Sequence, residues 1–209
     1  MQTPIRSQSR KENEMPMSGD HFVQNPMSIL TNGVTIKATP DRIWPWIVQI
    51  GSGRAGWYSY DWIDNGGHPS SKSILAEYQQ LAPGDIVPAI PGMTDAFCVA
   101  VVEPPLHLIL TVPDAKGGIQ VSYEFLLVPL DQDHTRLIVR GRISPRWPTA
   151  TKASPASSQP PTFIERVYEI LGSIPRPMKL AVGLLGHHMM ESRMLRGIKR
   201  RAVHTAVRG

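Results

Sequence analysis

The chain has little cysteine and no long hydrophobic run, and these two features exclude several classes of protein. Its 209 residues include one cysteine, Cys98, so no disulfide scaffold can form within the chain. The longest uncharged apolar run near the C-terminus, residues 180–186, is far shorter than the ~20 residues of a membrane-spanning helix. The N-terminal residues contain no apolar stretch typical of a secretory signal. We therefore expect a cytoplasmic protein.

An excess of positive charge is also missing from most of the chain. Residues 1–160 carry 13 Lys and Arg against 14 Asp and Glu, whereas residues 161–209 carry 9 against 3. A nucleic-acid-binding domain usually has a basic surface of its own, so no nucleic acid is expected as a partner. The basic excess belongs to the C-terminal segment alone.

This basic segment has two interpretations. Met190, Met194 and Ile198 form an apolar stripe at helical spacing, which favours a helix with one face on a core and a solvated basic face. The alternative is contact with an anionic membrane. Its candidate residues are Arg193, Arg196, Lys199, Arg200 and Arg201.

The order of hydrophobic patterns indicates one α+β domain. Residues 1–32 are polar and predict a disordered lead-in. Helical patterns follow at 39–50, 57–65 and 73–81, and alternating patterns then predict strands at 86–89, 97–102, 107–112, 119–130 and 136–144. A Pro/Ser-rich insertion at about 144–162 precedes a short helical pattern at 163–171, a long helix from about 178 to 203 and a tail at 204–209. We expect a curved antiparallel sheet wrapped around the long C-terminal helix.

Alternation along the last two strands predicts which side chains face inward. Tyr123 should point into the domain, and Glu124 should alternate with it. On residues 136–144, the odd-numbered positions are apolar or glycine and should face the interior. Arg136, Arg140 and Arg142 should then face solvent.

Several segments resemble START-like proteins of the SRPBCC superfamily. Residues 34–40 (VTIKATP) and 43–51 (IWPWIVQIG) are similar to the opening of its bacterial polyketide cyclase/dehydrase and lipid-transport-like group. Residues 56–65 (GWYSYDWIDN), 81–85 (LAPGD) and 190–201 (MESRMLRGIKRR) resemble motifs of one subgroup. The resemblance covers residues 33 to about 202 and implies a helix-grip fold, in which an antiparallel sheet and a long C-terminal helix enclose an apolar cavity. It implies binding of a hydrophobic small molecule and no fixed catalytic residues.

Aromatic side chains are concentrated between residues 44 and 62, which hold six of the ten Trp and Tyr residues. Such rings either line a ligand cavity or fill the core. Trp44 shares an apolar face with Ile43 and Ile47, which favours the core for this residue. For Trp57, Tyr58 and Tyr60 both interpretations stay open.

We therefore predict a protein that binds a lipid, a polyketide or a similar hydrophobic molecule in an internal cavity. The alternative is an aromatase/cyclase- or dehydratase-type enzyme, with Tyr60, Asp61 or Tyr123 in proton transfer. The predicted ligand-binding residues are Trp46, Trp57, Tyr60, Phe97, Val99, Tyr123, Phe125 and Val139.

Other polar residues predict no cofactor and no metal site. Asp61 and Asp64 would share a helix face, which is more typical of a cap or a solvated surface than of a catalytic pair. His187 and Glu191 are four residues apart, but two ligands are too few for a metal, and a polar patch near the cavity is favoured. Residues 51–56 match G-x-G-x-x-G without the strand before it that dinucleotide binding requires.

Overall fold

A computed structural model describes residues 10–90, 96–114, 117–147 and 176–205. The strands in this part of the chain are β1 (Ser28–Ile36), β2 (Ile86–Pro88), β3 (Ala96–Glu103), β4 (His107–Pro113), β5 (Ile119–Pro129) and β6 (Thr135–Ile143). The helical elements are α1 (Arg10–Glu14), η1 (Ser18–Phe22), α2 (Pro40–Val48), α3 (Asp61–Asp64), η2 (Ala76–Tyr78) and α5 (Arg176–Thr205).

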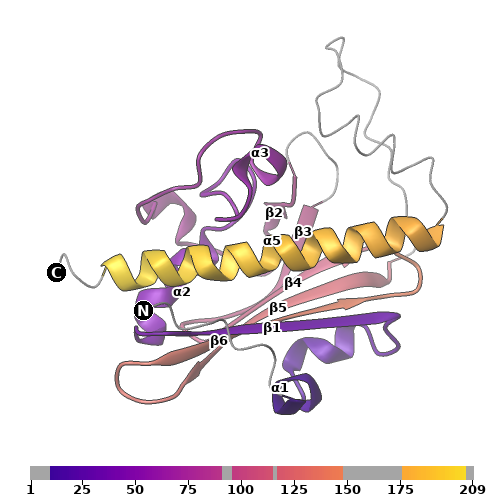
Figure 1. Cartoon of the computed structure of the whole chain (residues 1–209), viewed down its shortest axis with the longest axis horizontal. Coiled ribbons are helices and arrows are strands. Elements are labelled where there is room, and N and C mark those ends of the chain that lie inside the picture. The colour runs from indigo at the N-terminus through magenta and orange to yellow at the C-terminus, as the bar shows by residue number, and fades with distance from the viewer. Residues whose placement is uncertain (1–9, 91–95, 115–116, 148–175, 206–209) are drawn as a thin grey trace, which may run out of the picture.

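The strands form one antiparallel sheet in the order β1-β6-β5-β4-β3-β2. The strands from β2 to β6 follow one another in sequence as a meander. The last strand, β6, pairs with the first strand, β1, which forms the edge of the sheet opposite β2. The long helix α5 lies across one face of this sheet (Figure 1). The predicted α+β, helix-grip arrangement is confirmed.

The core lies between the sheet, α2 and α5. Leu137 and Val139 of β6 are fully buried in it, as the alternation predicts. From α5 the core takes Met194 and Ile198, together with neighbouring apolar side chains of the same face. Two residues of the predicted apolar stripe, Met194 and Ile198, therefore contact the core, whereas Met190 is only half-buried.

Two predicted helices are shorter than expected. Only α3 is helical within residues 57–65, and only η2 within 73–81. Tyr58 has a positive φ of 59°, a conformation that no α-helix contains. The backbone of Tyr58 also comes so close to α5 that a Cβ on Gly197 would lie 2.5 Å from the Tyr58 carbonyl oxygen. Gly197 therefore permits this close approach.

The N-terminal segment (residues 10–27) differs from the predicted disordered lead-in. It forms α1 and η1, and β1 then starts at Ser28, within the predicted lead-in. The segment covers the face of the sheet opposite α5, where Glu12 accepts two hydrogen bonds from Arg136, at 2.7 and 2.9 Å. These partners are more than a hundred residues apart in sequence, which explains why the local composition did not reveal the contact.

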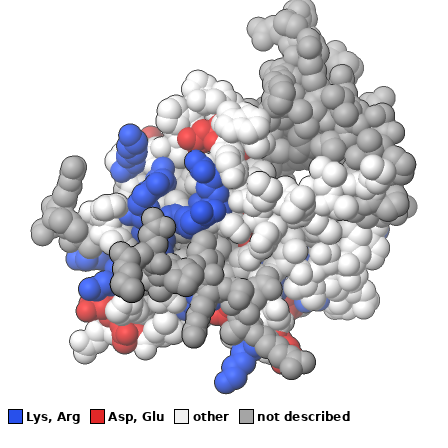
Figure 2. Space-filling view, in the orientation of Figure 1, with Lys and Arg blue, Asp and Glu red and all other residues white. Residues whose placement is uncertain are grey.

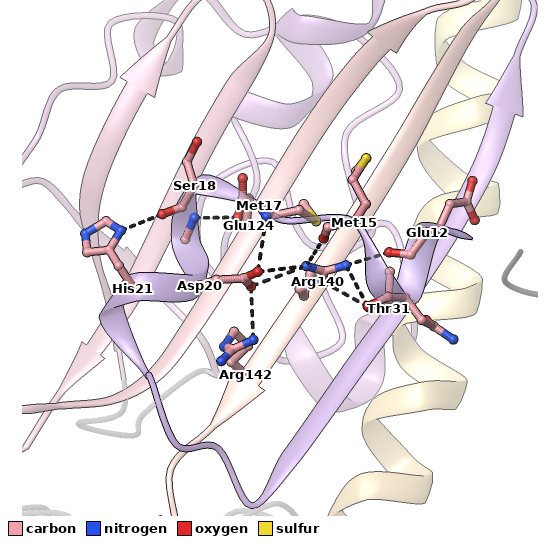
Figure 3. Close-up of polar contacts among 12 residues, drawn as sticks. Glu12, Met15, Met17, Ser18, Asp20, His21, Thr31, Glu124, Arg140 and Arg142 are labelled. Atoms are coloured by element: carbon pink, nitrogen blue, oxygen red, sulfur yellow. Dashed lines mark hydrogen bonds and ion pairs between the residues drawn. The ribbon is translucent and has the colours of Figure 1, made fainter. Parts of the chain in front are cut away.

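Arg140 is the centre of this contact, and its predicted solvent exposure is wrong. Its side chain is 3% exposed. Figure 3 shows its guanidinium between the strands and the N-terminal segment, with Nη1 donating to Asp20 at 3.0 Å and to the Met15 carbonyl oxygen at 2.8 Å. Its Nε donates to Thr31 at 3.1 Å. Arg142 also pairs with Asp20, at 3.2 Å.

Glu124 is buried on the same face. Its carboxylate accepts a hydrogen bond from the backbone N–H of Gly19 at 2.7 Å and contacts Nε2 of His107 (Figure 3 shows the Glu124 contact with the N-terminal segment). A Cβ at position 19 would lie 2.6 Å from this carboxylate, so glycine is required for the approach. These polar side chains on the face opposite α5 therefore contact the N-terminal segment and are not exposed to solvent.

Some predicted features lie outside the described residues. These are residues 148–162 of the insertion, the helical pattern at 163–171 and the end of the tail at 206–209. The domain boundaries proposed from sequence stay a prediction. Among the helices that the structure describes, none combines the length and the apolar character needed to cross a membrane.

Candidate functional site

A hydrogen-bonded polar cluster lies between α5 and the sheet. At its centre is Glu191, whose side chain is fully buried. The Tyr123 hydroxyl donates to its Oε2 at 3.0 Å, and Asn32 Nδ2 donates to Oε1 at 2.7 Å. His187 Nε2 lies 2.9 Å from Oε2. We call these four residues the Glu191 cluster.

The cluster residues come from three elements, α5, β5 and β1, and β1 supplies Asn32. His187 and Glu191 are one turn apart on α5, so both point toward the sheet. Tyr123 belongs to the inward face of β5 and pairs across the sheet with Gly141 of β6. A Cβ at position 141 would lie 3.5 Å from the Tyr123 ring and 3.8 Å from His187 Nε2. These are ordinary van der Waals distances, so position 141 lies in contact with both rings and does not depend on glycine.

The electrostatics of the cluster keep the tyrosine protonated. Burial raises the pKa of Tyr123 well above its usual value, and the negative charge of Glu191 raises it further. The tyrosine is therefore a hydrogen-bond donor to the carboxylate at all ordinary pH values. Among the described residues no Lys or Arg forms an ion pair with Glu191, so its charge is met by two neutral donors and His187.

Aromatic rings extend from the cluster toward the loop before α3. Tyr123 packs edge-on against His187 and Phe125, with ring centroids 5.5 and 5.0 Å apart. Phe97 stacks on Tyr123 at 5.9 Å, and Trp57 packs edge-on against Phe97 at 5.7 Å. Phe97 is half-buried and the His187 side chain is 37% exposed, so solvent reaches the row of rings at these two residues.

Seven of the eight predicted ligand-binding residues fall into two groups, and Tyr60, which lies under the Arg193 guanidinium, belongs to neither. Trp57, Phe97 and Tyr123 are brought together next to the Glu191 cluster. Four others are at most 1% exposed and pack in the closed core; they are Trp46, Val99, Phe125 and Val139. Phe125 belongs to this second group although it also touches Tyr123. Their role in binding stays a prediction.

Tyr60 and Asp61, the other predicted catalytic candidates, make contacts of a different kind. The Arg193 guanidinium lies over the Tyr60 ring at 4.5 Å. Asp61 accepts a hydrogen bond from Ser70, whose hydroxyl oxygen also accepts from the Tyr58 backbone N–H at 3.0 Å. The Arg193 contact joins the loop around α3 to the helix α5. The Ser70 contacts join two parts of that loop to each other. Of the three candidates, only Tyr123 lies in the Glu191 cluster.

Asp64 is a further buried acid on the α5 side of the sheet. It is 1% exposed, so the predicted solvated surface is wrong for this residue. Neither carboxylate oxygen has a hydrogen-bond partner of normal geometry among the described residues. Burial, and then the negative charge of Asp61, raise the pKa of Asp64 to about 7.

The cluster was only partly visible in the sequence. The pair at 187 and 191 and the inward direction of Tyr123 both follow from periodicity. Asn32 carried no signal, because its segment looked like part of the lead-in. In the described part of the chain, no group of three or more His, Cys, Asp or Glu side chains is arranged to hold a metal ion.

Comparisons with known proteins give weak structural likenesses. No family model and no curated protein matches the chain. A solution structure from Thermobifida fusca is 13% identical with a TM-score of 0.45, over 84% of this chain and 93% of that one. Protein MLL2253 from Mesorhizobium loti is 13% identical with a TM-score of 0.43, over 85% and 98%. CalU16 from Micromonospora echinospora is 16% identical with a TM-score of 0.36, over 86% of each chain. We base function on the chain's own residues, because these TM-scores are below 0.5.

Proposed function

We propose that the protein binds a hydrophobic small molecule beside the Glu191 cluster. The observation that carries this proposal is a buried carboxylate, with its own donors, at the end of a row of aromatic rings. A buried charge does not help the packing of a core, because transfer of a carboxylate from water into the protein interior costs on the order of several kcal/mol. Ligand sites commonly combine apolar walls with a few convergent polar groups.

In this proposal each group has a distinct role. Trp57 and Phe97 supply apolar ring surface, and Tyr123 and His187 supply the polar contacts that orient the ligand. Glu191 holds the hydroxyl and the imidazole in place through its two hydrogen-bonded oxygens. The resemblance of the sequence to START-like proteins agrees with a ligand of this kind, a lipid or a polyketide.

A second candidate is an enzyme of the aromatase/cyclase or dehydratase type. The contact of Tyr123, Glu191 and His187 at one carboxylate oxygen favours it, because adjacent titratable groups are what proton transfer requires. In this case His187, which is reachable from solvent, exchanges the proton, and Glu191 fixes the orientation of the imidazole.

Binding is tested with 1-anilinonaphthalene-8-sulfonate, an apolar fluorescent probe. We expect Phe97→Ala to weaken probe binding by roughly tenfold, since a large apolar contact is lost. Leu126→Ala is the control, because Leu126 is also half-buried and alternates with the core residues Phe125 and Leu127, which places it on the opposite face of the sheet. Equal probe affinity in the two variants would contradict the proposed site.

Native mass spectrometry of the protein purified from its own host then separates the two candidates. A retained apolar molecule identifies the ligand class. If the wild-type protein leaves this molecule chemically unchanged and Tyr123→Phe and Glu191→Gln retain less of it, the protein is a carrier. If wild-type protein converts the molecule and both variants bind it without converting it, the enzyme is favoured.

A further inference from the structure

An exposed apolar stripe runs along the N-terminal half of α5. Its members are four large side chains, each at least half exposed: Met178, Val182, Leu185 and Met189. Their spacing of four, three and four residues places them on one face of the helix. At 1.5 Å per residue, the stripe is roughly 16 Å long.

The same face becomes basic in the C-terminal half of the helix. After Met189 the spacing continues through Arg193, Arg196 and Arg200, and all three arginines are exposed. Figure 2 shows Lys and Arg side chains gathered toward the C-terminal half of α5 and uncharged surface over its N-terminal half. One helix face therefore carries an apolar region followed by a cationic one. We call it the outward face.

Arg193 lies over the Tyr60 ring and donates to the Ser59 carbonyl oxygen, but core packing does not account for the rest of the outward face. The core contacts of α5 are made by Met194, Leu195, Ile198 and Ala202, which are at most 3% exposed. These residues lie on the other side of the helix axis. Solvent exposure of four neighbouring large apolar side chains is unfavourable, and patches of this kind typically mark interaction surfaces.

We infer that the outward face of α5 docks on an anionic lipid surface. Phosphate headgroups match the arginine half, and the boundary between headgroups and acyl chains accepts the apolar half. A nucleic acid would meet the arginines but leave the apolar stripe in water. A second copy of the chain would cover the stripe but leave the arginines without opposite charge. A lipid surface is the partner that satisfies both halves at once.

The inference is tested by sedimentation of the full chain with vesicles. We expect binding to vesicles of phosphatidylcholine mixed with an equal part of phosphatidylglycerol, and little binding to phosphatidylcholine alone. Binding should fall steeply between about 0.1 M and about 1 M NaCl, as the Debye length shortens from ~10 to ~3 Å.

Two pairs of variants test separately the arginine half and the apolar half of the outward face. We expect Arg196→Glu to lower the partition constant on the order of tenfold, whereas Lys11→Glu, an equal charge reversal on α1, leaves it unchanged. We expect Leu185→Ser to weaken binding by a similar factor, whereas Leu130→Ser leaves it unchanged. Leu130 is a matched control because it is 54% exposed, against 64% for Leu185.

Three results would overturn the inference. The first is equal binding to neutral and anionic vesicles, and the second is an equal effect of a variant and its control. The third is a dimer in the absence of lipid that Leu185→Ser dissociates while no vesicle binding is seen. Because all variants are exposed surface positions, circular dichroism should show that each one stays folded.

Discussion

The two faces of the sheet both bury carboxylates, but they compensate them in different ways. Opposite α5, the partly exposed Asp20 lies between Arg140 and Arg142, and the partly exposed Glu12 accepts two hydrogen bonds from Arg136. The buried Glu124 on this face has His107 and the Gly19 backbone N–H as partners. On the α5 side, Glu191 has a tyrosine, an amide and a histidine as partners. Asp64, also on that side, has no hydrogen-bond partner of normal geometry among the described residues.

This difference separates a structural role from a functional one. A buried carboxylate paired with a permanently charged arginine is held in one state. A buried carboxylate without such a partner changes its protonation near neutral pH or binds further groups, which is typical of functional sites. The arginines of the ionic face, the one opposite α5, therefore fasten the N-terminal segment to the sheet, and the proposed binding site lies on the α5 face. The predictions below test this contrast, beginning with the largest expected effect.

Removing the central arginine should have the largest effect. In Arg140→Met, Asp20 keeps Arg142 but loses Arg140, and the carbonyl oxygens of Glu12 and Met15 lose a charged donor, so we expect the free energy of unfolding to fall by about 2–3 kcal/mol. Urea denaturation measures this loss. Arg42→Met is the matched control, since Arg42 is exposed and its replacement should change stability by less than about 0.5 kcal/mol. Similar losses in both variants would show that the ionic face is not a structural clamp.

Removing the buried charge at Asp64, where burial and Asp61 outweigh the opposing effects of Tyr60 and Ser59 on the pKa, should have the opposite sign. Its folded pKa of about 7 lies above the unfolded value near 3.9, so the folded protein loses stability as pH rises from about 4 through 7. At pH 8 we expect Asp64→Asn to be more stable than the wild type, on the order of a few kcal/mol. The gain should vanish near pH 4.

Denaturation curves across this pH range check the prediction for Asp64. Asp133→Asn removes an exposed acid and should show no such pH dependence. If Asp64→Asn were destabilising at pH 8, the carboxylate would have a stabilising partner, and the contrast between the two faces would fail at this residue.

The smallest effect is expected at His107 on the ionic face. Its hydrogen bond to Glu124 raises the pKa of His107 above the usual value, despite the opposing effect of burial, and Glu103 adds to the rise. The stabilisation is therefore complete below the unfolded pKa of about 6.5 and is lost as pH rises through the folded pKa. We expect His107→Gln to cost about 1 kcal/mol at pH 6 and less at pH 9.

The matched control for His107 is His134→Gln. His134 pairs with Asp131 in an exposed turn, where solvent weakens the interaction. A difference between pH 6 and pH 9 that is equal in both variants would assign the effect to surface charge and not to the buried pair.

The sequence by itself determined the strands β2 to β6, the inward face of β5 and β6 and the long C-terminal helix, but not β1. These features depend on periodicity, which is local: Tyr123 and Val139 point inward because alternate residues of a strand share a face. The core face of α5 was predicted on the same ground, since Met194 and Ile198 are one turn apart.

Only the tertiary structure decided which polar residues are buried. Arg140 and Glu124 alternate with apolar neighbours as surface residues do, yet the N-terminal segment covers them. Asn32 and Glu191, 159 residues apart, meet only because β1 lies beside β6 under α5. The physical reason is that a buried charge depends on partners brought in from elsewhere in the chain, and no local pattern records where those partners will lie.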